Sequence, residues 1–335
     1  MPDVRLLVAP DAFKGTFRAP EVAAAIGRGI EAAGLEPPDL CPIADGGEGT
    51  MEALVLALGG ETAGATVRGP LGRDIRAGFA LLEDGATAVV EVAEASGLGL
   101  VAEHERDAEA ATTHGTGDLI AAAVDAGAGV VLVAVGGSAT TDGGAGAIEA
   151  LREAGGLRNA RLVVLSDVRT PFERAAAVFA PQKGADAAAV RRLERRLDRF
   201  AAELPRDPRG VPMSGAAGGL SGGLWAAFGA QLEPGAPFVL DAVGYDERAR
   251  AAFAVVLGEG RLDATTLHGK AVFEAATRAR QMGVPAHAIV GQDRLDAFGK
   301  RMLDLQHVLE ASDARDLEAA GSDLAARLLS ETRPG

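Results

Sequence analysis

"VVLVAVGGSATTDGGAGAIEAL", residues 130–151, joins a strand-like run, a glycine-rich turn and a helical pattern in direct succession. The run 130–135 is apolar and rich in β-branched residues, as in a buried strand, and the residues after Ala145 have helical character. The turn between them contains glycine, serine and threonine beside a single carboxylate, Asp142. A strand that leads through a short turn into a helix predicts a βα unit, which places the chain in the α/β class.

The same alternation continues toward both ends of the chain. The first helix would bury Val22, Ile26 and Ile30 on one face, and a second helix is expected from about Thr50 to Leu58. A charged helix is expected at 187–204. Strand-like runs are expected at 4–9, 40–44, 161–166, 253–258, 286–291 and 307–309.

One stretch departs from this rhythm. Between about 66 and 92, two β-rich runs flank a Glu-Asp-Gly turn, which predicts an antiparallel hairpin. Because a hairpin interrupts a parallel sheet, we expect a second α/β domain to be inserted there into a first domain built from both chain ends. The segment 204–222, rich in Pro, Gly and Ser, is expected to be a mobile connection near the junction of the two.

Composition excludes several classes of partner. The formal net charge of −14 would repel a nucleic acid or an anionic membrane, and the aromatic fraction of 4% leaves little for base stacking. The single cysteine, Cys41, cannot form an intramolecular disulfide. No signal-peptide pattern opens the sequence, and the apolar runs are shorter than a membrane span. We therefore expect a soluble, cytoplasmic protein that does not bind membranes.

Four clusters of glycine and charged residues follow predicted strands and precede predicted helices. In a parallel sheet such turns meet at the carboxyl edge, where ligands bind. Ordinary helix capping explains the composition of any one of them, so the functional interpretation depends on their recurrence. None has the Walker or the dinucleotide-binding pattern. The clusters are 10–17, 45–50, 136–146 and 258–270.

These turns contain the parts that phosphoryl transfer needs, namely phosphate donors, cations, metal-binding carboxylates and a proton acceptor. Ser138, Thr140 and Thr141 add hydroxyl donors to the glycine N–H groups, and Asp142 could hold a metal or cap the helix. Other candidates follow the same logic. Asp45 and Glu48 could share a metal, act as acid and base, or form a capping pair, while Lys14, Lys183 and Lys270 each lie beside a glycine.

Other catalytic patterns are missing from the sequence. The five histidines show no metal-ligand spacing, and no nucleophile elbow of the GxSxG type occurs. The alternating Arg, Glu and Asp residues of 187–204 are typical of a solvated helix face. We therefore expect neither a zinc site nor a hydrolase triad.

Ten motifs, in order, resemble the landmarks of the bacterial type I glycerate kinase family. The resemblance runs from about residue 5 to at least residue 291. The motifs are "APDAFKGT", "PIADGGEGT", "VRGPLGR", "EVAEASGL", "TTHGTGDLI", "VGGSATTDGGAGA", "FAPQKGA", "GAAGGLSGGL", "VLDAVG" and "GEGRLDATTLHGKA".

The resemblance implies ATP- and Mg²⁺-dependent phosphorylation of D-glycerate to 2-phosphoglycerate or 3-phosphoglycerate. It also implies a flavodoxin-like α/β domain formed by 1–66 and 245–335 and a middle α/β domain formed by 67–244, with the active site in the cleft between them. By motif position, the implied site residues are Lys14, Asp45, Ser138, Asp142, Asp167, Lys183, Glu259, Asp263 and Lys270.

On this basis we assign hypothetical roles. Asp45, Lys14 and Asp263 are expected to be catalytic, and Lys14, Glu48 and Arg73 to bind the substrate. Asp142, Asp167 and Glu259 are the expected Mg²⁺ ligands. The expected ATP-binding residues are Gly136, Gly137, Ser138, Thr140, Thr141, Lys183 and Lys270.

Several positions depart from the family's pattern. The family usually has Asn where this chain has Thr141, and Thr where this chain has Leu257. Where this chain reads "SDVRTP" (166–171), which includes Thr170, the family has Cys-Asp-Val and then an Asn. The segment between Gly156 and Arg161 is also much shorter. These departures leave open a kinase for a related hydroxy acid, or a non-catalytic two-domain protein that binds and responds to one. The sequence leaves open a monomer or a homodimer.

Overall fold

Two sheets organise the chain, and each belongs to its own unit. The computed structural model describes residues 5–331. The described residues up to Asp45 and from Ala236 onward form one unit, here called the end unit, and Gly46–Gly235 form the other, the middle unit. The limits expected from the sequence were 66/67 and 244/245.

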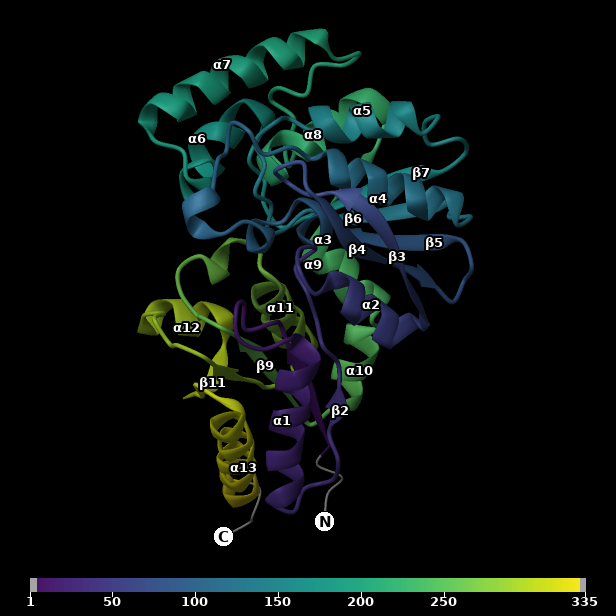
Figure 1. Cartoon of the computed structure of the whole chain (residues 1–335). Coiled ribbons are helices and arrows are strands. Elements are labelled where there is room, and N and C mark those ends of the chain that lie inside the picture. The colour runs from purple at the N-terminus through teal and green to yellow at the C-terminus, as the bar shows by residue number, and fades with distance from the viewer. Residues whose placement is uncertain (1–4, 332–335) are drawn as a thin grey trace. The chain divides into compact units, whose positions relative to one another are not determined.

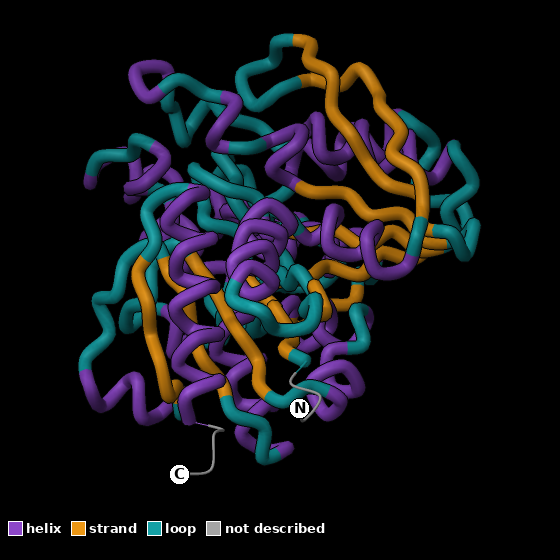
Figure 2. The backbone as a smooth tube through the Cα atoms, turned by 90° about the horizontal axis from the view of Figure 1, so that it is seen from below, coloured by secondary structure: helices purple, strands orange, loops and turns teal. Residues whose placement is uncertain are grey.

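The end unit contains a five-stranded sheet in the order β11-β10-β9-β1-β2, and every pair is parallel. This is the flavodoxin-like order, in which the first strand lies between the second and third. Figure 2 shows strands in orange with helices packed against them. The strands are β1 (Leu6–Pro10), β2 (Asp39–Leu40), β9 (Ala254–Glu259), β10 (Ala286–Val290) and β11 (Leu305–Glu310).

Most of these strands confirm the sequence prediction, but β2 is shorter than the expected run 40–44. The N–H groups of Cys41 and Ile43 still bond to the carbonyls of Val8 and Pro10. Pro42 lies between these two donors on an edge strand, where its position faces away from β1, so its missing N–H removes no hydrogen bond from this pairing. Residue 4, where the first strand was expected to begin, lies outside the described residues.

Helices α1 (Ala19–Ala32) and α13 (Ala314–Glu331) lie side by side in the end unit (Figure 1). Val22, Ile26 and Ile30 are buried as predicted and share a core cluster with α13. The helices approach closely at Gly29, where an added Cβ would lie 1.9 Å from the carbonyl oxygen of Glu318. The remaining helices are α9 (Gly235–Ala242), α10 (Tyr245–Ala251), α11 (Ala271–Met282) and α12 (Ala297–Leu303).

The middle unit contains a six-stranded mixed sheet in chain order from β3 to β8. The predicted hairpin is confirmed as the antiparallel pair β4–β5, and the pairs from β5 to β8 are parallel. An additional edge strand, β3, pairs with β4. The strands are β3 (Gly60–Arg68), β4 (Asp74–Leu82), β5 (Thr87–Glu91), β6 (Val130–Ala134), β7 (Arg161–Ser166) and β8 (Gln231–Pro234).

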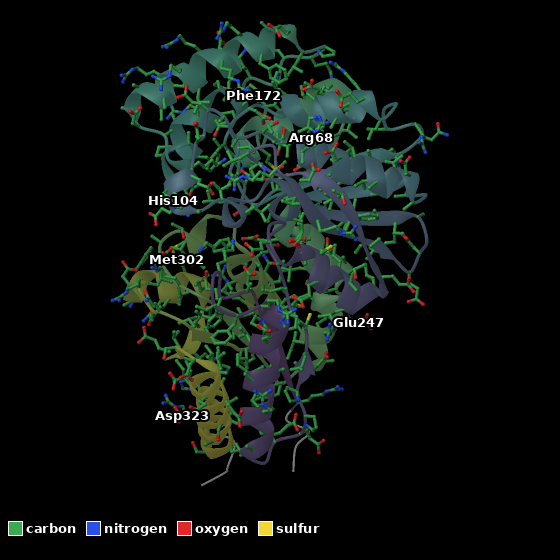
Figure 3. The ribbon with its side chains drawn as sticks, viewed as in Figure 1. Arg68, His104, Phe172, Glu247, Met302 and Asp323 are labelled. Carbon is green, nitrogen blue, oxygen red and sulfur yellow. The ribbon has the colours of Figure 1, made fainter. Side chains whose placement is uncertain are left out.

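The middle unit's helices pack on this sheet or on one another. The charged helix α7 buries Leu193, Leu197 and Ala201 in a cluster with Phe172, which is labelled in Figure 3, and its other faces carry the charges. The helices are α2 (Thr50–Leu58), α3 (Val92–Ser96), α4 (His114–Asp125), α5 (Ala145–Glu153), α6 (Ala175–Phe179), α7 (Ala187–Glu203) and α8 (Leu220–Phe228).

The expectation of a mobile connection at 204–222 is wrong for its second half. Residues 214–224 are buried, and they include the start of α8. Gly218 lies so close to the glycine-rich turn that an added Cβ would meet the carbonyl oxygen of Thr140 at 2.0 Å. Glycine and serine occur here because two backbone segments pack against each other. The same residues are typical of loops, so the sequence of this segment resembles that of a loop.

In the described part of the chain, no helix is long and apolar enough to cross a membrane.

Candidate active site

A pocket of about 630 Å³ lies in the end unit at the carboxyl ends of β1 and β9. These two strands form the point where the strand order of a flavodoxin-like sheet reverses, which is where such folds bind ligands. The pocket is lined by charged side chains from the turns after both strands. Those charged residues are Asp11, Lys14, Glu259, Arg261, Asp263 and Lys270.

Asp11 is one of two acids of this pocket with only 4% of their surface exposed, and the other is Glu259. Burial raises the pKa of Asp11 well above the usual range, and the neighbouring Asp45 raises it further, while Lys14 opposes both. The sequence analysis did not select Asp11. The available signal was its position, since it is an acid directly after the first strand in "PDAFKGTF".

Lys14 and Asp45 form an ion pair, with 3.2 Å between Nζ and Oδ2. The Asp45 side chain is buried, whereas the Lys14 side chain remains 56% exposed. The turn that carries Lys14 is closed by a hydrogen bond from the N–H of Phe13 to the carbonyl of Phe17. Gly15 permits this turn because its φ is +83°.

Glu259, the last residue of β9, forms the other side of the pocket. Its carboxylate lies 3.2 Å from the Lys270 Nζ and accepts a 2.7 Å hydrogen bond from the Thr266 hydroxyl. Burial raises the pKa of Glu259, and Lys270 and Thr266 partly offset that rise. Asp263 differs, because hydrogen bonds from the Thr265 hydroxyl and N–H lower its pKa.

The structure therefore gathers five of the expected site residues within the end unit. The five are Lys14, Asp45, Glu259, Asp263 and Lys270. The remaining expected residues belong to the middle unit.

Asp142, in the middle unit's glycine-rich turn, is saturated with hydrogen bonds. Its Oδ2 accepts from the N–H and the hydroxyl of Thr113, at 2.9 and 2.8 Å. It also accepts from the N–H groups of Gly144 and Gly146. This geometry joins the beginnings of α4 and α5, which is a capping role. Thr113 was missed by the sequence analysis, although it lies in the quoted motif "TTHGTGDLI".

Lys183 is buried beneath the same turn, with 2% of its surface exposed. Its Nζ donates to the Ser138 hydroxyl at 2.9 Å and to the Thr140 carbonyl. Burial lowers the pKa of Lys183 to about 7, against the opposing effect of Asp142. The hydroxyls of Thr140 and Thr141 are buried too, without a hydrogen-bond partner among the described residues.

Within 136–144, the backbone reaches the surface only at Gly136 and Gly137. The segment 46–48 packs directly on them. An added Cβ on Gly136 would lie 2.6 Å from the Cα of Gly47, and one on Gly137 would lie 3.7 Å from the Glu48 Oε2. The accessible part of the turn is thus flanked by a carboxylate.

The last two expected residues, Arg73 and Asp167, are not buried. Arg73, between β3 and β4, is exposed and forms an ion pair with Glu105. Asp167 directly follows β7 and is partly exposed. Among the described residues, no group of three or more His, Cys, Asp or Glu side chains is arranged to hold a metal ion. The roles given to these residues stay predictions.

Comparison with known proteins identifies the family. The model of the glycerate kinase family matches residues 6–155 and 152–333. Glycerate kinase of Bacillus subtilis (strain 168) is 40% identical over 331 residues, covering 88% of this chain and 86% of that protein. Glycerate 2-kinase of Escherichia coli (strain K12) is 35% identical over 324 residues, covering 86% and 85%.

A solved structure matches the fold of this chain along nearly the whole length of both proteins. It comes from Salmonella typhimurium LT2, is provisionally assigned as a glycerate kinase 2, and is 34% identical. The TM-score is 0.82, and the match covers 98% of this chain and 99% of the other. The chain therefore belongs to the glycerate kinase family, with the ATP-dependent phosphorylation of glycerate as its activity.

Proposed function

We propose that the end-unit pocket is where D-glycerate, the phosphates of ATP and Mg²⁺ meet. One observation carries this proposal: two buried acids, Asp11 and Asp45, and two lysines, Lys14 and Lys270, gather at the switch point of the sheet. Anionic ligands and a divalent cation would satisfy both kinds of charge. The family membership and these charges favour a kinase over the non-catalytic alternative.

Asp11 fits a carboxylate ligand of a magnesium site. Mg²⁺ in kinases takes one or two protein carboxylates and fills its other positions with phosphate oxygens and water, so a preformed cage of three acids is not required. Burial and, after it, the neighbouring Asp45 raise the pKa of Asp11, and a bound cation would favour its charged form. When bound there, Mg²⁺ would offset the negative charge of the transferred phosphoryl group. Among the expected ligands Asp142, Asp167 and Glu259, Asp142 is the less favourable one, because its carboxylate already accepts four hydrogen bonds.

Asp45 is the proposed proton acceptor for the glycerate hydroxyl. As the hydroxyl oxygen attacks the γ-phosphorus, its proton passes to Asp45 and the bond from phosphorus to ADP breaks. Asp263 is the weaker candidate, because the hydrogen bonds from Thr265 lower its pKa. Lys14 and Lys270 would hold the carboxylate of glycerate or the phosphates as ion pairs.

The middle unit would contribute backbone N–H groups at Gly136 and Gly137, the accessible part of the turn. The buried hydroxyls of Thr140 and Thr141 favour a structural role for these two residues. Placement of the active site in a cleft between the two domains, expected from the sequence, stays a prediction.

The test is phosphorus NMR of the protein with D-glycerate, ATP and Mg²⁺, followed until ADP is released. We expect one phosphoglycerate product, and its chemical shift distinguishes 2-phosphoglycerate from 3-phosphoglycerate. Chelation with EDTA should abolish turnover, and excess Mg²⁺ should restore it. Parallel samples with tartronate and erythronate test the preference among hydroxy acids.

A variant pair tests the proposed magnesium site. Asp11→Asn should raise the Mg²⁺ concentration needed for half-maximal rate by at least tenfold, because one carboxylate ligand is lost. Asp263→Asn is the matched control in the same pocket and should leave that concentration within about twofold. An unchanged Mg²⁺ dependence in Asp11→Asn would show that the metal is held elsewhere.

A further inference from the structure

Glu91, the last residue of β5, is a buried acid for which the proposed reaction gives no role. It is 5% exposed. Its Oε1 accepts the N–H of Met51 at 2.7 Å, and its carboxylate also accepts from the backbone of Gly49. Both donors belong to the start of α2, distant in sequence from the strand that carries Glu91.

The start of α2 needs such an acceptor. The first N–H groups of a helix have no partner within the helix, and a side chain at the N-cap normally supplies one. The N-cap of α2 is Gly49, with φ +92° and no side chain. A carboxylate is well suited to this position because it also interacts favourably with the helix dipole. Glu91 therefore caps α2 from the neighbouring strand.

The capped segment holds Glu48 on the glycine-rich turn. At its beginning, the carbonyl of Gly46 accepts the N–H of Val135, which follows β6, at 3.0 Å. At its end, Gly49 is bound by Glu91. Glu48 lies between these two anchors, exposed, with its carboxylate next to Gly137.

We propose that Glu91 is a positioning residue for the reaction, which fixes Glu48 against the Gly136–Gly137 turn by holding the start of α2. The inference rests on the proposed function, because it assumes that Glu48 and this turn contact a substrate. Glu91 itself touches neither glycerate nor ATP.

The charge state of Glu91 makes this positioning dependent on pH. Burial raises the pKa of Glu91 to about 7, although the N–H groups of Met51 and Gly49 oppose the rise. Glu94, on α3, and Glu48, before α2, raise it slightly more. Above pH 7 the carboxylate accepts both N–H groups, whereas below pH 7 one oxygen carries a proton and the cap weakens.

Two variants and a control test the inference by amide hydrogen exchange and steady-state kinetics. Glu91→Ala should speed exchange at Gly49 and Met51 by at least tenfold and lower kcat/KM by about 10- to 100-fold, mainly through kcat, as expected for a misplaced group. Glu91→Gln keeps one acceptor, so kcat/KM at pH 8 should stay within about threefold. The pH profile of kcat/KM for this variant should lack the change near pH 7 that the wild type shows. Glu94→Gln, whose native carboxylate binds Gly78 rather than α2, should change neither the amide exchange at Gly49 and Met51 nor kcat/KM at pH 8.

Two results would overturn the inference. One is Glu91→Ala with unchanged exchange and kcat/KM within twofold of wild type. The other is a pH profile of kcat/KM for Glu91→Gln that superimposes on the wild-type profile. This second measurement remains possible if the alanine variant does not fold. Hydrogen exchange reports on the cap whether or not the end-unit pocket is the reaction site. Failure of the proposed function would instead appear as unimpaired turnover in Asp45→Asn.

Discussion

The end-unit pocket and the middle unit's glycine-rich turn look alike in sequence but differ in how their polar groups are satisfied. In the pocket, buried carboxylates repel one another and a half-exposed lysine faces solvent. In the turn, Asp142 accepts four hydrogen bonds from the protein, and Lys183 donates to two oxygens of the turn itself. Charged groups that line a pocket are available to a ligand, whereas charged groups that are buried in hydrogen bonds with the protein hold the chain in place. We therefore propose that the pocket carries the proton transfer and the metal, and that Asp142 and Lys183 hold the turn in place.

The largest expected effect tests the pocket. Asp45→Asn should lower kcat by about 10²–10⁴, because the proton acceptor is lost. The measurement is ADP release in a coupled assay, with circular dichroism to confirm folding. A kcat within about threefold of wild type, far from the loss expected for an acid–base role, would remove Asp45 from the mechanism.

The next prediction tests the turn at Asp142. Asp142→Ala should lower the free energy of unfolding by roughly 3 kcal/mol, because buried N–H and hydroxyl donors lose their acceptor. Urea denaturation measures this, and kcat per folded molecule should stay within about threefold. A stable but inactive variant would reverse the comparison and favour a metal-binding Asp142.

Lys183 provides a pH test of the same turn. Its pKa is lowered to about 7 in the folded state, while an unfolded lysine titrates near 10.5. Between these values the unfolded chain binds more protons, so the free energy of unfolding should rise with pH, by roughly 2–3 kcal/mol from pH 7 to 9.5. Urea denaturation at both pH values should show this rise in wild type and in Lys300→Met, and not in Lys183→Met. A flat wild-type profile would contradict the buried state of Lys183.

The smallest expected effect is on stability, and it comes from two glycine variants that distinguish backbone strain from a role in substrate binding. Gly15 and Gly283 have φ values of +83° and +72°, and an added Cβ would meet no atom within 4 Å at either. Alanine at each should therefore destabilise the fold by about 1 kcal/mol, seen in urea denaturation. Only Gly15→Ala should also change KM, because Gly15 shapes the turn that carries Lys14. Equal KM values in the two variants would separate this turn from substrate binding.

Much of the fold could be predicted because its strands are buried. Runs such as 161–166 and the helix 50–58 were expected with the limits that the structure shows. The edge strand β3 was not, because both of its faces are largely exposed and its sequence lacks alternating apolar residues. The buried residues 214–222 were interpreted as part of a mobile connection because close backbone packing and loops both select glycine.

The site was harder to predict than the fold, because a sequence does not show burial. Asp142 lies in a conspicuous glycine-rich motif, yet its oxygens are occupied by Thr113 and the start of α5. Asp11 lies in the quoted motif "APDAFKGT", but its significance comes from burial beside Asp45, which the sequence does not show. Glu91 was part of a quoted motif, but its partners on α2 become visible only in three dimensions.

The pairing of β1 with β9 fixes a sequence of events during protein synthesis. Leu6 pairs with Ala254, so the centre of the end sheet joins strands that are separated by the whole middle unit. On the ribosome, β1 emerges first and has no central partner until residues beyond 254 have been translated. The middle unit's six strands are all complete by then. Lys14 is therefore made before the middle unit, while Glu259 and Lys270, which line the same pocket, are made after it, so this pocket can form only once both segments have been translated.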